Sequence, residues 1–248
     1  MNGRWQKECA YHHIQSMPVH PAFLKNLNLL RDLPAETLAA VAQKASERSF
    51  ARREMVLKKG DVGLALCFLL EGRLQGVDFT VDGREVGLYF IDPNDYFDEL
   101  TVIDGQPRPE VVIAVARSRV LYLPREEARK LMFISPATSE QVTTRLALRL
   151  RQASAQRTLL ALPNPFQRLC AQLLLMSATS GNKVEIIHAP THQEIAIMIN
   201  ASRETVTRAF QVLQVRGTLK RDGTLFSVED PAYLKDVAEG KLEPPKAG

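Results

Sequence analysis

Residues 191–213 read THQEIAIMINASRETVTRAFQVL, and this segment carries the clearest structural signal in the chain. Thr191 and Glu194 have the spacing of a capping box, which predicts that a short helix begins here. Ser202 is an N-cap residue for a second helix. Asn200 lies in the turn between them, where a residue that tolerates a left-handed backbone is favoured. The residues expected to face the interior are Ile195, Ala196 and Ile199 on the first helix and Val206, Phe210 and Leu213 on the second. The segment therefore predicts a helix-turn-helix.

The outer side of the second helix carries polar groups suited to reading bases in a DNA major groove. Arg203 and Glu204 fall in its first turn, and Arg208 lies about one turn further on. An arginine can bind guanine O6 and N7 through two hydrogen bonds, and a carboxylate can accept from cytosine N4. A glutamate beside DNA is electrostatically costly, so its place between arginines favours base reading over general charge attraction. The residues expected at phosphates are Gln193, Ser202, Thr205 and Thr207.

A hairpin is expected downstream of this helix pair. Residues 219–226 contain the dipeptide Asp222-Gly223, which favours a tight turn between two short strands. Lys220 and Arg221 would then lie near the DNA backbone, which makes the whole a winged helix-turn-helix. The alternative is an ordinary helical hairpin with solvated charges, but the caps, the outward arginines and the hairpin together favour DNA binding.

Upstream, Pro163 and Pro165 end a long helix that we expect from about Pro136 to Leu162. Asn164 as N-cap, with Pro165 at the first helical position, begins the next helix. An apolar stripe typical of a coiled-coil dimer seam consists of Val142, Leu146, Leu150, Ala153 and Leu160. The alternative is a helix packed on its own domain.

Between about residues 50 and 124, short apolar and β-branched runs alternate with turn signals. Asp82-Gly83, for example, predicts a hairpin between residues 77–79 and 86–88. Many short strands at this spacing indicate an antiparallel sandwich or barrel.

The composition suits a soluble globular protein, with 45% hydrophobic and 24% charged residues, and a net charge of +4 permits a nucleic-acid partner. Cys9, Cys67 and Cys170 are scattered and odd in number, which argues against a disulfide framework. We find no secretory signal and no apolar run long enough to span a membrane, so we expect a cytoplasmic protein without membrane association.

The segment Gln193-Glu194-Ile195, followed by Ser202–Val206 and Arg208, resembles the cyclic AMP receptor protein/FNR (CRP/FNR) family of bacterial transcription regulators. The resemblance covers about residues 25–230. It implies an N-terminal β-roll that senses a ligand, a long helix that dimerises, and a winged helix-turn-helix that binds a palindromic operator. The three residues expected to read bases match the family's base-reading positions, which implies a TGTGA-like half-site. Two half-sites about one helical turn apart follow from dimer symmetry.

The predicted fold class is therefore α+β, with an antiparallel β-roll of the cyclic-nucleotide-binding kind, a long dimerisation helix and a C-terminal winged helix-turn-helix. The expected segments are a flexible N-terminal extension at 1–22, the β-roll at 23–134, the dimerisation helix at 135–162, the DNA-binding domain at 163–232 and a C-terminal tail at 233–248.

The family's cyclic AMP pocket is altered in this sequence. Where members that bind cyclic AMP have Gly-Glu-Leu, Arg-Ser-Ala and Thr-Ser, this chain has Asp98-Glu99-Leu100, Arg108-Pro109-Glu110 and Ala153-Ser154. A glycine lets a backbone amide approach an anion, whereas Asp98 adds a negative charge beside it. Pro109 has no N–H and no hydroxyl, so a phosphate donor is lost. Of the polar residues in these segments only Glu99, Arg108 and Ser154 persist, and an ion pair of Arg108 with Glu99 or Asp98 is expected.

These substitutions argue against the usual use of cyclic AMP. We expect no cofactor, and a regulator that binds DNA without a small effector; the alternative is another effector, such as a cyclic dinucleotide. An iron–sulfur cluster of the FNR kind needs four cysteine ligands, and the chain has three cysteines. Cys9, His12 and His13 belong more naturally to a flexible extension than to a metal site, so we expect no metal.

Two other classes of protein compete with this interpretation. A cupin-like enzyme would need inward histidines, but the five histidines lie at 12, 13, 20, 188 and 192, outside the β-roll strands, so we expect no enzyme. A small-molecule-binding scaffold protein would leave the outward arginines unexplained. The expected partners are double-stranded DNA and a second copy of the chain. RNA polymerase is a further candidate, because family activators touch it at the position of residues 179–183.

Overall fold

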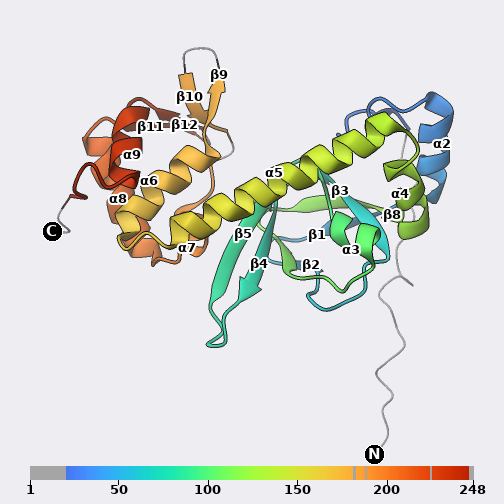
Figure 1. The fold of residues 1–248 in the computed structure, drawn as a ribbon, viewed down its shortest axis with the longest axis horizontal. Coiled ribbons are helices and arrows are strands. Elements are labelled where there is room, and N and C mark those ends of the chain that lie inside the picture. The colour runs from blue at the N-terminus through green and yellow to red at the C-terminus, as the bar shows by residue number, and fades with distance from the viewer. Residues whose placement is uncertain (1–20, 181–182, 188, 224, 246–248) are drawn as a thin grey trace, which may run out of the picture. The chain divides into compact units, whose positions relative to one another are not determined.

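The computed structural model describes residues 21–180, 183–187, 189–223 and 225–245 (Figure 1). They form two compact units. The first reaches to Val77 and includes Tyr89–Leu146, and the second holds Asp78–Leu88 and the chain from Ala147 onward. The division falls inside the long helix α5 (Pro136–Leu160), earlier than the predicted boundary after residue 162. The helix itself begins where the sequence predicts.

Two four-stranded sheets with antiparallel pairing make up the β-roll, in the orders β1-β8-β3-β6 and β2-β7-β4-β5. The strands are β1 (Ser46–Phe50), β2 (Met55–Leu57), β3 (Ala65–Glu71), β4 (Leu74–Phe79), β5 (Glu85–Ile91), β6 (Tyr96–Phe97), β7 (Val111–Ala114) and β8 (Ser118–Pro124). The predicted turn between β4 and β5 is present: Gly83 has a φ of 79°, and the Thr80 amide donates to the Arg84 carbonyl at 2.9 Å. The fold class predicted for this region is confirmed.

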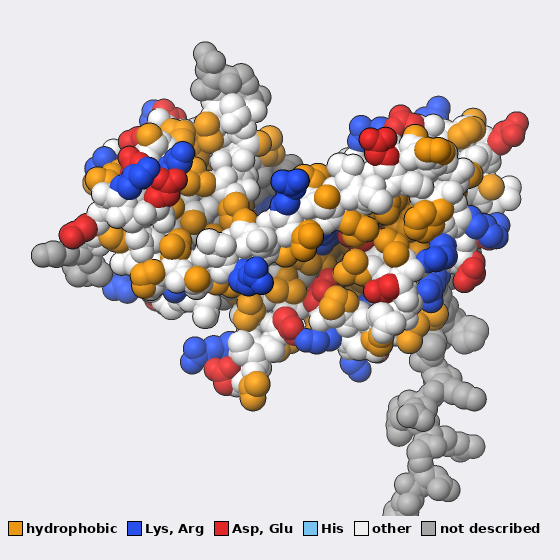
Figure 2. Space-filling view, viewed as in Figure 1, with side chains coloured by type: hydrophobic (Ala, Val, Ile, Leu, Met, Phe, Trp, Pro, Cys, Tyr) orange, Lys and Arg blue, Asp and Glu red, His pale blue; other side chains and the backbone are white. Residues whose placement is uncertain are grey.

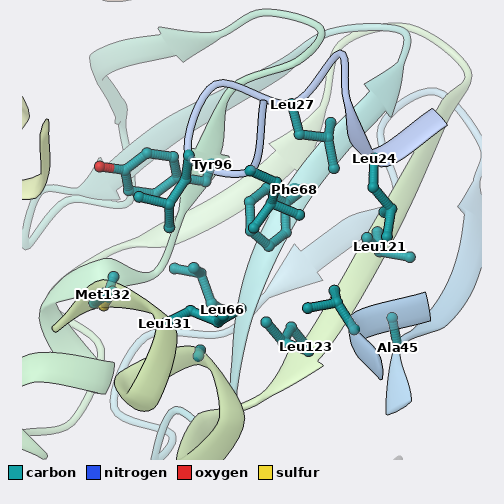
Figure 3. Close-up of a cluster of buried hydrophobic side chains, with 14 of the residues drawn as sticks. Leu24, Leu27, Ala45, Leu66, Phe68, Tyr96, Leu121, Leu123, Leu131 and Met132 are labelled. Carbon is teal, nitrogen blue, oxygen red and sulfur yellow. The ribbon is translucent and has the colours of Figure 1, made fainter. Parts of the chain in front are cut away.

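Successive side chains of β3 supply two different cores, because they point to opposite faces of the strand. Leu66 and Phe68 join a cluster with the helices, and Cys67 and Leu69 join a second cluster within the roll. Figure 3 shows the first cluster, in which Leu66 and Phe68 lie among side chains of α4 and β8. The helices of this unit other than α5 are α1 (Pro21–Leu24), α2 (Ala35–Lys44), α3 (Glu99–Asp104) and α4 (Arg125–Met132). The predicted N-terminal extension lies outside the described residues as far as residue 20.

Four helices and a four-stranded sheet of order β11-β12-β10-β9 follow α5 in the second unit. They are α6 (Pro165–Met176), β9 (Ala178–Ser180), β10 (Lys183–Ile186), α7 (His192–Met198), α8 (Arg203–Val215), β11 (Leu219–Asp222), β12 (Leu225–Val228) and α9 (Pro231–Ala238). The pair β9–β10 was not predicted, and it extends the wing hairpin into a larger sheet.

The predicted C-terminal tail is wrong for its first residues. Asp230 caps helix α9 by accepting from the Tyr233 amide, with Pro231 at the first helical position. Tyr233, Leu234 and Val237 are buried, and α9 packs on α6. The helix therefore belongs to the folded domain.

No helix among the described residues combines the length and apolar character needed to cross a bilayer.

Candidate nucleic-acid interface and effector pocket

Local capping builds the helix-turn-helix from the residues that the sequence indicates. The Thr191 hydroxyl accepts from the Glu194 amide, and the Glu194 carboxylate accepts from the Thr191 amide at 2.9 Å, which completes the capping box. The Ser202 hydroxyl accepts from the Thr205 amide at 3.1 Å and starts α8. Asn200 has the left-handed φ of 49° expected in the turn. All six predicted interior residues of the two helices are buried.

The three residues expected to read bases are exposed on α8. Arg203, Glu204 and Arg208 all project from this helix into solvent. Hydrogen bonds from its own backbone amide and from Ser202 lower the pKa of Glu204, so the carboxylate is ionised at neutral pH. An ionised acceptor flanked by two arginines presents both kinds of group that distinguish guanine from cytosine.

The residues expected at phosphates lie in three different situations. Gln193 is exposed, while the Ser202 and Thr205 hydroxyls lie 3.0 Å apart and bond to each other. Thr207 is half-buried, and its hydroxyl donates to the Arg203 carbonyl at 2.9 Å.

The wing is a hairpin of β11 and β12, as predicted, with Asp222 paired to Leu225. Its loop residue Gly223 has a φ of 56°, and residue 224 lies outside the described residues. Lys220 is exposed and forms an ion pair with Glu229 at 3.2 Å. Arg221 is exposed and donates to the Gly223 carbonyl at 3.1 Å. On the face that Figure 2 shows, basic and acidic side chains are interspersed, so no single broad basic field marks that face.

Two residues that the sequence did not single out hold the turn of the helix-turn-helix in place. Gln156 of α5 donates to the Met198 carbonyl at 2.7 Å, and Arg168 of α6 donates to the Asn200 carbonyl at 3.2 Å. Both contacts join segments far apart in the chain, so no local pattern could have predicted them.

Two of the predicted pocket residues of the β-roll, Arg108 and Asp98, form an internal ion pair. Arg108 donates to Asp98 Oδ2 through Nη2 at 2.7 Å and through Nε at 2.9 Å. Burial works to lower the pKa of Arg108, but the hydrogen bonds that Arg108 donates to Asp98 more than offset this effect, so the pKa is raised. Burial raises the pKa of Asp98 and opposes the lowering by Arg108. Asp98 also has a left-handed φ of 68°, a conformation in which glycine is the unstrained residue.

The second retained acid, Glu99, faces an arginine of the long helix. It is buried at the start of α3, and its Oε1 atom lies 3.7 Å from Nε of Arg145. Arg145 also binds the Asp95 carboxylate and the Tyr96 carbonyl, and its guanidinium lies 4.3 Å over the Tyr96 ring. The retained glutamate is therefore part of an ion-pair cluster within the roll.

A third internal contact involves Tyr89, which the sequence did not single out. Its hydroxyl donates to Glu110 at 2.5 Å, and its ring lies so close to Gly76 that a Cβ there would stand 2.7 Å from Tyr89 Cζ. The absence of a side chain at Gly76 is what admits the ring. Pro109 is exposed, and Ala153 and Ser154 are exposed on the part of α5 that belongs to the second unit.

The predicted dimer stripe on α5 divides into two parts. Val142 is buried and Leu146 packs on the roll's own core, as in the alternative interpretation of this helix. Further along, Leu150 is 72% exposed and Ala153 is exposed. Leu160 is half-buried in the second unit.

Within the described residues, no group of three histidine, cysteine or acidic side chains is placed to hold a metal ion. Cys67 and Cys170 are both buried free thiols, and burial raises their pKa, that of Cys170 to about 12. Neither is a reactive thiolate at neutral pH.

Comparison with known proteins agrees with both units. Residues 47–135 match the model of the cyclic nucleotide-binding domain, and residues 167–237 match that of the Crp-like helix-turn-helix domain. A CRP-like cAMP-activated global transcriptional regulator of Mycobacterium tuberculosis is 27% identical over 85% of this chain and 96% of its own length. The cyclic AMP receptor protein of Thermus thermophilus is 26% identical over 88% of this chain and 99% of its own.

The fold is shared with FixK2 of Bradyrhizobium japonicum, at a TM-score of 0.66 and 21% identity over 78% of this chain and 96% of that one. A CooA mutant from Carboxydothermus hydrogenoformans gives a TM-score of 0.67 at 14% identity over 91% and 98%. The match to the Crp-like helix-turn-helix domain and the similarity to the curated regulators define the chain as a transcription regulator with a helix-turn-helix DNA-binding domain. It belongs to the cyclic AMP receptor protein/FNR family.

Proposed function

We propose that this regulator binds a palindromic TGTGA-like operator as a homodimer and does so without the usual dependence on cyclic AMP. The observation that carries the operator preference is the exposure of Arg203, Glu204 and Arg208 together on α8. Two arginines and one ionised carboxylate can read guanines and a cytosine by direct hydrogen bonds. Gln193, Lys220 and Arg221 are also exposed and carry groups that can contact phosphates.

A dimer through α5 is supported by the exposed apolar part of its stripe. Leu150 is 72% exposed in a single chain, so its apolar side chain contributes little hydrophobic stabilisation there. Burying it with Ala153 against the same residues of a second copy would supply a two-fold seam, and a two-fold dimer matches a palindromic site.

Independence from cyclic AMP is supported by the charges inside the roll. A phosphate held by Arg108 would have to displace Asp98, which already makes two short bonds to it and adds a repelling negative charge. Glu99 faces Arg145. Groups that could bind a nucleotide therefore have partners within the chain.

A second candidate is a regulator that responds to another nucleotide. It is favoured by the match to a cyclic nucleotide-binding domain and by the retention of Glu99, Arg108 and Ser154. A contact with RNA polymerase near residues 179–183 is compatible with both candidate functions. Both kinds of regulator would act in the bacterial cytoplasm, where the DNA lies.

The test is fluorescence anisotropy with a labelled palindrome of two TGTGA-type half-sites, against a scrambled duplex of equal length. Salt is held fixed, because non-specific affinity depends steeply on it. We expect selective binding with no nucleotide present. Binding that appears only with cyclic AMP would contradict the proposed independence, and equal affinity for both duplexes would contradict the operator.

A matched pair of variants separates base reading from charge. Arg203→Ala should lose about 1–3 kcal/mol of discrimination between the two duplexes. Lys235→Ala removes one exposed positive charge from α9 of the same domain and should leave the discrimination unchanged.

A further inference from the structure

His192, the first residue of α7, joins the three parts of the DNA-binding unit. Its ring is stacked on Phe210 of α8, with centroids 4.6 Å apart and an interplanar angle of 17°. Phe210 lies 5.2 Å from the Phe226 ring in wing strand β12, and the Arg221 guanidinium lies 5.5 Å over that ring. One column of rings therefore runs from α7 through the recognition helix to the wing.

Two consecutive hydrogen bonds link the same imidazole to the backbone of Arg203, one of the residues expected to read bases. Nδ1 of His192 lies 2.9 Å from the Thr207 hydroxyl. That hydroxyl donates to the Arg203 carbonyl oxygen, also at 2.9 Å. A threonine hydroxyl has one hydrogen, and a carbonyl can only accept it. Both bonds therefore form together only when Nδ1 carries a proton and donates to Thr207.

The two hydrogen bonds have a consequence for Thr207 itself. Its hydrogen is given to the Arg203 carbonyl and its oxygen accepts from His192, so the hydroxyl has no hydrogen left for a phosphate. Thr207 thus acts as an internal link between α7 and the first turn of α8.

We propose that His192 is a positioning residue for operator binding. Through Thr207 and Phe210 it fixes the first turns of α8 on α7, and so sets the direction in which Arg203 projects. This role rests on the proposed function, because it concerns how accurately a base is read. It predicts that loss of the Nδ1–Thr207 bond weakens binding to the operator more than binding to a scrambled duplex.

Three variants separate the stacking of the His192 ring from its hydrogen bond to Thr207. His192→Phe keeps a ring for Phe210 and removes the donor, Thr207→Val removes the link with little change of shape, and His192→Asn keeps a donor close to the Nδ1 position. We expect operator affinity to fall about three- to ten-fold in the first two, the range that one net hydrogen bond gives. His192→Asn should retain most of the affinity, and scrambled-duplex affinity should stay the same throughout.

A double-mutant cycle tests whether the effect passes through Arg203. Added to Arg203→Ala, the change His192→Phe should cost no further operator affinity. An equal loss in both backgrounds would overturn the proposal, as would His192→Asn failing to rescue. Thermal unfolding is used to check that each variant is folded. If His192→Phe is not, Thr207→Val carries the same cycle.

Different outcomes would overturn the role of His192 and the proposed operator binding. A wild type that binds the operator selectively, with all three variants equal to it, overturns the role of His192 alone. A wild type that does not distinguish operator from scrambled duplex overturns the proposed function, and this role with it.

Discussion

Arg108 and Asp98 form a two-bond ion pair inside the β-roll, with side chains only 11% and 3% exposed. The carboxylate occupies the one guanidinium that the resemblance assigns to a nucleotide phosphate. We predict that Asp98→Gly with Pro109→Ser creates measurable affinity for cyclic AMP. A freed charge-assisted bond contributes about 1.5–3 kcal/mol, so affinity should rise about ten-fold or more over the wild type. Isothermal titration calorimetry measures it.

The matched control is Asp82→Gly, which removes an exposed carboxylate from the β4–β5 turn. It should leave nucleotide binding as weak as in the wild type. Tight binding of cyclic AMP by the wild type itself would show that Asp98 does not exclude the phosphate.

A second prediction concerns the ion-pair cluster that ties the start of α5 to the roll. Arg145 is 18% exposed and binds the Asp95 carboxylate, the Tyr96 carbonyl and Glu99. Removing one member of a buried ion pair leaves the other charge without compensation, which costs about 3–5 kcal/mol. Arg145→Met should therefore lower the free energy of unfolding by this amount in urea titrations. Arg151→Met, at an exposed position of the same helix, should change it by less than about 0.5 kcal/mol. Equal effects would contradict the role of the cluster.

The pH dependence of stability follows from His192. Burial, followed by the charges of Arg221 and Arg203, lowers the pKa of this histidine. Just below the ordinary histidine pKa of about 6.5, the unfolded chain therefore binds more protons than the folded one. This contribution to stability is complete above that pH and is lost as the pH falls below it. Thermal unfolding at about pH 7.5 and 5.5 should show a smaller drop for His192→Asn than for the wild type. The same drop in both would contradict the assignment.

The helix-turn-helix could be predicted almost residue by residue because its signals are local. Caps act over three residues, the apolar faces follow the helical period, and Asn200 is one of the few residue types that accept the left-handed turn. The ion pair of Arg108 was expected from charge alone, and the structure assigns it to Asp98 as the direct partner.

What the sequence could not supply depends on contacts between distant segments. Arg145 reaches Asp95 across 50 positions, and Gln156 reaches Met198 across 42. Tyr89 fits only because position 76 is a glycine. The predicted tail from residue 233 includes most of helix α9, whose residues Tyr233, Leu234 and Val237 are buried because the helix packs on α6. Pairings of this kind are set by tertiary packing, which local propensity and periodicity do not describe.

Two exposed leucines lie on opposite faces of α5. Leu150 belongs to the predicted seam and is 72% exposed, whereas Leu148, two residues earlier and on the other side of the helix, is 55% exposed and outside it. In a two-fold seam, the change Leu150→Glu would bring the new charge opposite the same charge of the second copy. We therefore expect the molar mass from light scattering to halve and the affinity for the palindrome to fall. Leu148→Glu introduces the same charge away from the seam and should leave the dimer intact. The reverse outcome would move the seam to the Leu148 face, and two unchanged masses would show that α5 does not hold the dimer together.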